Sequence, residues 1–99
     1  MYNPIVDEKA RGKLKSHIRF LKNVNEFAAE KFYVEYKQNL IKLAENPHNS
    51  LKYEHKKNQN LKYKLFYKNR FRIVFEIIEN NVYILDIQDC RQDSDKNII

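Results

Sequence analysis

The first half of the chain carries apolar residues at helical spacing. A first set, separated by four, four and three positions, consists of Ala10, Leu14, Ile18 and Leu21. This spacing places one apolar stripe on a helix that ends near Lys22, and Asp7 just before it is a favourable N-cap. The β-prone stretch Tyr2 to Val6 precedes the cap, and Pro4 restricts that stretch to a sheet edge or a strand start.

A second and longer helix follows. Its apolar stripe consists of Ala29, Phe32, Tyr36, Leu40 and Leu43. Asn25 is a natural N-cap, and Pro47 disfavours helical geometry at Asn46, so the helix is expected to end near Glu45. Because only about three residues join the two helices, they are predicted to form an antiparallel hairpin.

The hydrophobic period changes from helical to alternating after the segment 47–60, which shows no convincing period and is predicted to be a loop. Three strands follow, with apolar positions at Tyr63, Leu65 and Tyr67, at Phe71, Ile73, Phe75 and Ile77, and on both faces of Val82 to Ile87. Turns are predicted at Lys68-Asn69 and at Glu79-Asn80-Asn81, because asparagine tolerates positive φ. The last strand is apolar on both faces and is expected to be covered or central.

These elements predict an α+β fold of the order β-α-α-β-β-β, with a helical hairpin packed on one face of an antiparallel sheet. Residues 1–93 form a single domain in this interpretation, and residues 94–99 form a polar C-terminal tail. Strand alternation places Phe71, Ile73 and Phe75 under the helices, and Arg70 and Arg72 on the opposite face.

The composition adds a strong asymmetry of charge. The net charge is +6, and the 21 residues from Lys52 to Arg72 hold eight basic residues against one acid. A single glycine, Gly12, excludes Gly-rich phosphate loops, and a single cysteine, Cys90, excludes an internal disulfide or a multi-thiolate zinc site. We therefore expect no metal and no cofactor. No apolar run reaches the length of a membrane helix, so a soluble, cytoplasmic chain without a membrane partner is expected.

The basic residues are predicted to converge on one face of the sheet. Alternation places Lys62 and Lys64 on one face of their strand, and the following turn is expected to bring that face beside Arg70 and Arg72. Arg91 joins this cluster from the end of the last strand. Such an arrangement suits a polyanion, since lysine and arginine neutralise phosphates.

Neighbouring residues complete this predicted surface. The second hairpin is expected to place Arg72 opposite Gln88, and the aromatic rings of Phe66 and Tyr67 offer surfaces on which bases could stack. The alternative is a merely solvated sheet face, because alternating lysine also protects an exposed strand from aggregation.

The histidines and the cysteine are weaker candidates. His17 falls at the border of the first apolar stripe and is expected to be structural or half-exposed. His48 and His55 lie in the loop before the basic strands, where either could act as a general acid or base, although a solvated loop histidine is more common. Cys90 is expected to be packed rather than nucleophilic.

Several segments together share the pattern of a known family. They are Leu40 to Pro47, Leu61 to Leu65, the arginine-led strand Arg70 to Ile77, Val82 to Ile87, and Asp89 to Asp93. This pattern resembles the RelE/ParE superfamily, the toxins of bacterial type II toxin–antitoxin modules. The resemblance spans Tyr2 to Asp93 and implies the same fold as the periodicity. It also implies a small antitoxin protein as a partner.

Two activities follow from the resemblance. RelE-like members cleave mRNA in the ribosome without a metal, and the matching catalytic residues would be Lys62, Lys64, Arg72 and Arg91. The RNA-binding set would add Lys68 and Arg70. RelE-like enzymes carry a Tyr or a His-Tyr pair after the last arginine, whereas residues 92–99 contain neither. His48, His55 or Tyr67 are conjectural substitutes for the missing general base.

The second activity requires no catalysis. ParE-like members inhibit DNA gyrase by protein contact, and the long helical hairpin favours this branch. A third alternative is a non-toxic nucleic-acid-binding module with the same fold. The resemblance therefore implies a growth-arresting toxin whose target is either the ribosome and its mRNA or DNA gyrase, and it leaves open whether the chain is an enzyme.

Overall fold

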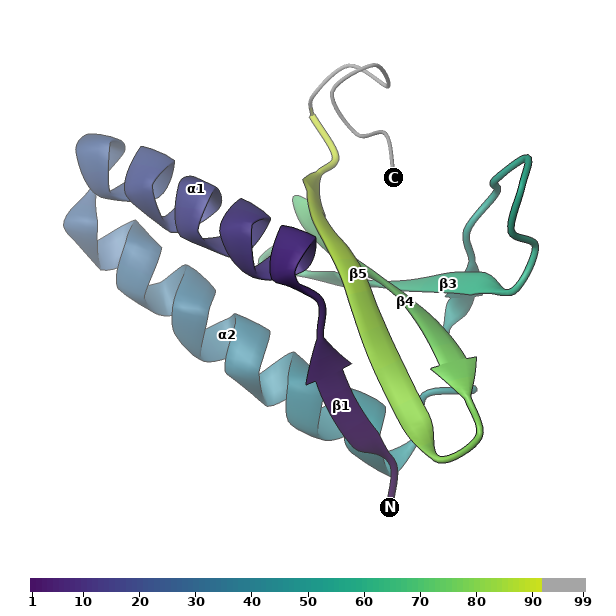
Figure 1. The fold of residues 1–99 in the computed structure, drawn as a ribbon. Coiled ribbons are helices and arrows are strands. Elements are labelled where there is room, and N and C mark those ends of the chain that lie inside the picture. The colour runs from purple at the N-terminus through teal and green to yellow at the C-terminus, as the bar shows by residue number, and fades with distance from the viewer. Residues whose placement is uncertain (92–99) are drawn as a thin grey trace.

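The computed structural model describes residues 1–91. Two helices lie side by side against one face of a five-stranded sheet (Figure 1). The elements follow in the order β1 (Asn3–Val6), α1 (Glu8–Val24), α2 (Glu26–Glu45), β2 (Leu51–Lys52), β3 (Leu61–Phe66), β4 (Phe71–Ile78) and β5 (Asn81–Asp89). The predicted α+β order is confirmed, whereas the polar tail predicted over residues 94–99 lies outside the described residues.

One asparagine joins the two helices. Asn25 is the C-cap of α1 and also the N-cap of α2, where its side-chain oxygen accepts from Phe27 N at 2.9 Å and from Ala28 N at 3.4 Å. The connection is therefore shorter than the predicted three residues, and α1 continues to Val24 rather than ending near Lys22. A residue that satisfies the backbone groups of both helix ends makes a longer linker unnecessary.

The sheet has the strand order β1-β5-β4-β3-β2. The predicted sheet was entirely antiparallel, but β1 pairs with β5 in parallel, with Ile5 beside Tyr83. The helical hairpin carries the chain across the sheet after β1, which permits the parallel pairing. β5 thus lies between β1 and β4 as a central strand. Its apolar residues pack on both faces, with Ile84 and Ile87 in the main core and Leu85 against a smaller cluster on the other face. The segment predicted to be a loop contains the two-residue strand β2, whose Lys52 pairs with Lys62 of β3.

The main core lies between the helices and the sheet. Phe71, Ile73 and Phe75 of β4 are fully buried there against Phe32 of α2, so the predicted face assignment of β4 is confirmed. A second, smaller cluster lies on the opposite face. It consists of Tyr53, Leu61 and Val74, with Tyr63 and Leu85 packed against it.

A β-bulge reverses the alternation of β5. Val74 pairs with Asp86, but the next residue, Phe75, pairs with Ile84, so Leu85 is an extra residue in β5. Before the bulge Ile84 faces the helices, and after it Asp86 and every second residue beyond face the other way. The bulge therefore places polar side chains of β5 on the face that the helices leave uncovered.

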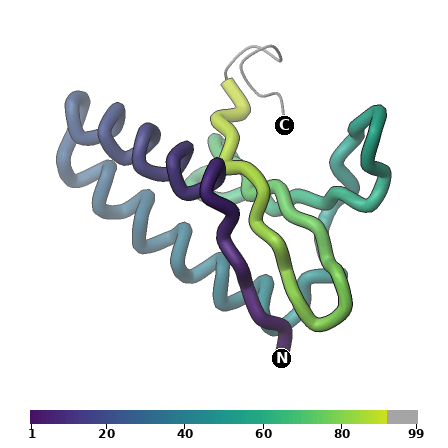
Figure 2. The backbone as a smooth tube through the Cα atoms, viewed as in Figure 1, coloured from purple at the N-terminus to yellow at the C-terminus, as the bar shows by residue number. Residues whose placement is uncertain are grey.

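The turn between β3 and β4 contains four residues, 67–70, between the paired residues Phe66 and Phe71. Tyr67, Lys68 and Asn69 all have positive φ, from 54° to 62°. The segment between β2 and β3 lies on the opposite side of the molecule from the helical hairpin (Figure 2). These two connections determine where the basic residues of 52–72 are displayed.

Candidate binding site on the open sheet face

The basic residues that were expected to converge lie in three separate places. Lys62 and Lys64 pair with Phe75 and Ile73 and share the helix-side face with them, whereas Arg72 pairs with Leu65 and faces the other way. Cross-strand partners lie on the same face of a sheet. The predicted single basic face is therefore wrong. A turn centred between Lys68 and Asn69 pairs even-numbered residues of β3 with odd-numbered residues of β4, whether it contains two residues or four, so Lys62 and Lys64 cannot share a face with Arg72.

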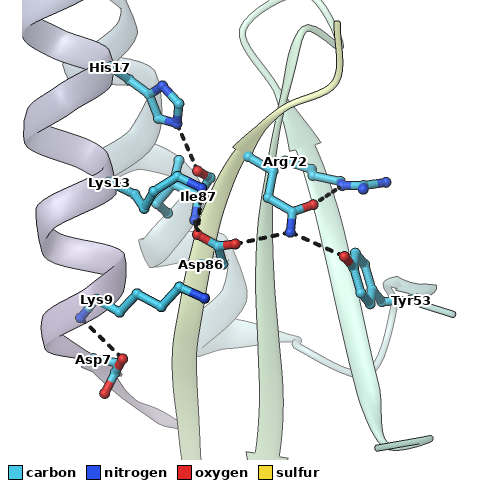
Figure 3. A network of polar contacts seen from close by, with 9 residues as sticks. Asp7, Lys9, Lys13, His17, Tyr53, Arg72, Asp86 and Ile87 are labelled. Atoms are coloured by element: carbon cyan, nitrogen blue, oxygen red, sulfur yellow. Dashed lines mark hydrogen bonds and ion pairs between the residues drawn. The ribbon is translucent and has the colours of Figure 1, made fainter. Parts of the chain in front are cut away.

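Arg72 is the basic residue at the centre of the open face. Its Nε donates to Oε1 of Gln88 at 2.7 Å, as Figure 3 shows for the network around it. Its guanidinium carbon lies 4.9 Å from the ring centroid of Tyr53 and 5.4 Å from that of Tyr63. Both distances permit cation–π attraction, so one hydrogen bond and two rings hold the guanidinium in place. The predicted pairing of Arg72 with Gln88 is confirmed.

Gln88 belongs to a buried polar chain that crosses the sheet edge. Its Nε2 donates to the hydroxyl of Tyr53 at 3.1 Å and to Oδ2 of Asp86 at 3.0 Å. Asp86 is fully buried, and its Oδ1 lies 3.3 Å from Nζ of Lys13 on α1. Since the amide nitrogen has two acceptors, the amide oxygen must point at Arg72. The chain of contacts therefore links α1 to the guanidinium on the open face.

Arg70 and Arg91 occupy a different place, a cleft beside α1. Nη2 of Arg70 lies 3.5 Å from Oδ2 of Asp89, and Nε of Arg91 lies 3.9 Å from its Oδ1. The cleft has a volume of about 590 Å³ and is lined by Lys13, Ser16, His17, Phe20, Arg70, Asp89 and Arg91. Lys68 lies away from it, exposed in the β3–β4 turn.

A third basic group lies at the edge formed by β2 and β3. Lys52 and Lys62 are directly opposite each other in the register, and Lys64 lies on the same face as Lys62. Within residues 1–91 none of the three forms an ion pair. Like charges on opposed strand positions repel. His48 lines the adjacent hollow, where its ring nitrogen Nε2 lies 2.9 Å from the hydroxyl of Tyr2.

The aromatic residues expected beside the arginines are in the core instead. Phe66 is buried against Phe32, and Tyr67 packs edge-on against the same ring at 5.7 Å. The rings beside Arg72 are Tyr53 and Tyr63, which the sequence analysis did not select. Tyr53 fell in the predicted loop, whereas the register of the predicted Lys68-Asn69 turn already places Tyr63 on the face of Arg72. The alternation of Tyr63 with the flanking lysines was the available signal.

The remaining candidates are dispersed. His17 is buried rather than half-exposed, and its Nε2 donates to the carbonyl of Ile87 at 2.7 Å. Burial lowers the pKa of His17, although that hydrogen bond opposes the shift. Nδ1 of His55 accepts from the backbone N–H of Lys57 and of Asn58, each at 3.2 Å. The conjectural general bases His48 and Tyr67 are on the helix side of the sheet, away from Arg72.

Cys90 is exposed just beyond the end of β5, so the expectation that it would be packed is wrong. Partial burial raises the pKa of its thiol, and the charge of Arg72 opposes that change. Across residues 1–91, no three His, Cys, Asp or Glu side chains gather as a metal site. In the same part of the chain no helix is long and apolar enough to cross a membrane.

The architecture is shared with known toxins. The chain superposes on the isolated RelE toxin of E. coli with a TM-score of 0.61 and 14% identity, over 98% of this chain and 93% of that one. It also superposes on a chain of the intact E. coli RelBE toxin–antitoxin complex with a TM-score of 0.60 and 14% identity, over 93% and 100% of the two chains. These matches define the fold class as RelE-like.

The family is given by the sequence. Residues 5–94 match the family model of the ParE toxin of the type II toxin–antitoxin system, parDE. The chain therefore belongs to the ParE toxin family, within the RelE/ParE superfamily that its motifs resemble. A search of curated protein sequences finds no significant match.

Proposed function

We propose that this toxin arrests growth by binding DNA gyrase through the open sheet face, without cleaving RNA, and that a small cognate antitoxin neutralises it. The observation that carries the proposal is the group formed by Arg72, Tyr53 and Tyr63. Arginine and tyrosine are the residues that dominate protein–protein hot spots. A guanidinium already held by Gln88 loses little conformational freedom when a partner binds.

The distribution of charge argues against cleavage. Metal-independent RNA cleavage by electrostatic stabilisation needs several cations aimed at one phosphate. In this fold Lys62 and Lys64 are separated from Arg72 by the sheet itself. Arg91 pairs with Asp89 in a third place. The cations that the resemblance assigned to one catalytic site therefore lie in three different places.

RelE-like, metal-independent mRNA cleavage in the ribosome is the second candidate. The lysine group at the β2–β3 edge favours it, because Lys52, Lys62 and Lys64 form no ion pair among residues 1–91. Unpaired cations on one strand edge suit the backbone of an RNA. In this alternative Lys68 and Arg70 assist in binding the message. A non-toxic nucleic-acid-binding module is the third candidate. DNA gyrase and the ribosome are both cytoplasmic, so either target implies a cytoplasmic toxin.

The test compares two substitutions in a supercoiling assay with purified gyrase. Arg72→Gln is expected to raise the toxin concentration needed for inhibition by about 30-fold or more, since hot-spot side chains contribute at least about 2 kcal/mol. Lys64→Gln removes one charge from the other face and is the matched control. It is expected to inhibit within about threefold of the unchanged chain, because lysines outside the contact contribute little beyond steering.

Three results would contradict the proposal. The first is normal supercoiling at saturating toxin. The second is ribosome-dependent mRNA cleavage, mapped by primer extension, that is lost on Lys62→Gln and Lys64→Gln. The third is the absence of growth arrest when the chain is expressed from an inducible promoter, which would leave only the binding module.

A further inference from the structure

The cleft beside α1 is chemically distinct from the open sheet face. One wall is a single stripe of α1 that contains Lys13, Ser16 and Phe20, and the opposite wall holds Arg70 and Arg91. The end of β5 forms its floor, where β1 no longer covers the strand because their pairing stops at residues 6 and 84. The cleft is therefore open to solvent and bounded by side chains from α1, the β3–β4 turn and β5.

Among residues 1–91, three cations line the cleft and two carboxylates pair with them, of which Asp89 lines the cleft and Asp86 lies outside its lining, so the cations exceed the paired carboxylates by one. Arg70 and Arg91 share the single carboxylate of Asp89, while Lys13 pairs with Asp86. Both carboxylates are buried, so the excess positive charge lies at the surface of the cleft. One additional negative group would balance it.

Arg70 also has an unused donor. Its Nε is buried and has no hydrogen-bond acceptor among residues 1–91. Its Nη2 contact to Asp89 is long, at 3.5 Å. A buried donor without a partner is costly, and charged donors cost more than neutral ones. A carboxylate placed in the cleft would balance the excess charge, and a rotation of the Arg70 side chain away from the Phe71 ring, whose centroid lies 5.0 Å from its guanidinium carbon, would give this Nε–H an acceptor.

An apolar stripe leads away from the cleft. Phe20 lines the cleft and is 57% exposed, and Val24, one helical turn further along α1, is 73% exposed. Residues four apart on a helix lie on the same face. A partner segment that binds here would therefore meet a basic socket beside two exposed apolar side chains.

We propose that this cleft binds one Asp or Glu side chain of the cognate antitoxin, with large apolar residues of the same antitoxin segment packed on Phe20 and Val24. The proposal rests on the antitoxin partner of the proposed function and not on the choice between gyrase and RNA. An excess of one charge matches a single carboxylate. A nucleic acid would need a run of unpaired cations, and those are at Lys52, Lys62 and Lys64 instead.

The first test measures the affinity of the full chain for the antitoxin encoded beside it, after the purified complex is separated and reassembled. Arg70→Gln is expected to weaken binding by about 10- to 100-fold, the range for a charged hydrogen bond. Arg70→Lys keeps the charge but lacks Nε, and its affinity is expected to fall between that of the unchanged chain and that of Arg70→Gln. Lys57→Gln, an identical loss of charge at an exposed position between β2 and β3, is the control and is expected to stay within about twofold.

Phe20→Ser keeps the proposal testable if Arg70 variants fold poorly. Phe20 is exposed, so its replacement is expected to leave thermal unfolding unchanged and to weaken antitoxin binding by about three- to tenfold. Equal losses for Arg70→Gln and Lys57→Gln would overturn the proposal, as would full affinity of Phe20→Ser.

The second test identifies the occupant. The acidic residues of the antitoxin are replaced one at a time, and one of them is expected to show no further loss in combination with Arg70→Gln. Exchange of the Arg70 Nε–H with solvent, followed by its ¹⁵N NMR signal, is expected to be slower in the complex than in the free chain. Protection in the free chain that disappears on truncation after residue 91 would identify the chain's own C-terminus as the occupant and overturn the proposal. Competition by a single-stranded RNA that is lost on Arg70→Gln would also overturn it. A failed gyrase assay leaves all these results valid.

Discussion

At the scale of single residues, the most important feature is that the hydrogen-bond acceptor of Arg72 is an uncharged group. The acceptor at 2.7 Å is the amide oxygen of Gln88 rather than a carboxylate. The nearest acid in the chain of contacts, Asp86, is balanced by Lys13. The positive charge of Arg72 is therefore positioned without being neutralised, and it remains available to an anionic group of a partner. A carboxylate in place of the amide would hold the guanidinium equally well but would cancel its charge.

A second residue that matters at this scale is His17, whose side chain links α1 to β5 by a hydrogen bond. Its Nε2 donates to the carbonyl of Ile87, beyond the point where β1 stops pairing with β5. Burial lowers the pKa of His17 from 6.5, the Ile87 hydrogen bond raises it, and the charge of Lys13 lowers it further. The charges of Asp86 and Asp89 raise the same pKa by smaller amounts. The folded chain thus binds the proton of His17 less tightly than the unfolded chain does.

Stability is expected to fall with acidification through this histidine. The unfolded chain binds more protons as soon as the pH drops below about 6.5, so the contribution of His17 is complete above that pH and is lost as the pH falls towards the lowered folded pKa. Urea unfolding at pH values from 5 to 7.5 measures the effect. His17→Gln is expected to be less stable at pH 7.5 and to show a flatter profile, whereas an unchanged slope would contradict the assignment.

At the scale of elements, short connections decide the orientation of the strands. The β4–β5 turn consists of Glu79 and Asn80, between the paired residues Ile78 and Asn81. Asparagine was expected to adopt positive φ in this turn, but the residue with positive φ is Glu79, at 57°. A left-handed conformation costs a non-glycine residue about 1–2 kcal/mol. This strain is tolerated because the two strands it joins are both central.

Glycine is therefore expected to stabilise this turn at one position only. Glu79→Gly removes the left-handed penalty but adds entropy to the unfolded chain, so a net gain of about 0.5–1 kcal/mol is expected. Asn80→Gly, the adjacent control, gains nothing from positive φ and is expected to be neutral or destabilising. Urea unfolding of both variants provides the comparison, and an equal effect of the two substitutions would show that the strain is not at Glu79.

At the scale of the whole molecule, the charge is uneven and largely unpaired. The chain carries a net charge of +6, and Lys52 and Lys62 lie opposite each other at a sheet edge. A compact state with a large net charge is destabilised by self-repulsion. The ion pairs of the described residues are concentrated around Asp86 and Asp89 near α1, far in sequence from these lysines.

Added salt is therefore expected to stabilise the fold. Raising NaCl from about 10 mM to about 200 mM shortens the screening length from about 30 Å to below 10 Å, so the urea midpoint is expected to rise. Lys62→Gln is expected to gain about 0.5 kcal/mol at low salt and to respond less to added salt, because it removes a directly opposed like charge. Lys56→Gln in the exposed loop is the matched control. A salt response that is identical in the two variants would contradict this explanation.

The elements themselves were predictable because their signals are local. Helical spacing, the caps Asp7 and Asn25, and the apolar alternation of Phe71, Ile73 and Phe75 depend on neighbours within a few residues. Arg72 could also be selected as a candidate, since its face follows from the phase of β4. Its ring neighbour Tyr63 could be selected too, because the register of a turn at Lys68-Asn69 places it on the same face. Tyr53 could not, because it lies between β2 and β3 in a segment without a hydrophobic period.

The sequence alone thus determined the two helices, the three long strands, the family resemblance and the concentration of charge between Lys52 and Arg72. The tertiary structure decided how the remaining charges are divided over the surface. The register of β3 and β4 places Lys62 and Lys64 opposite Phe75 and Ile73 on the helix side, and one extra residue at Leu85 puts Asp86 and Gln88 on the open face. The physical reason is the two-residue period of a strand, which makes a shift of one residue transfer every side chain to the other face.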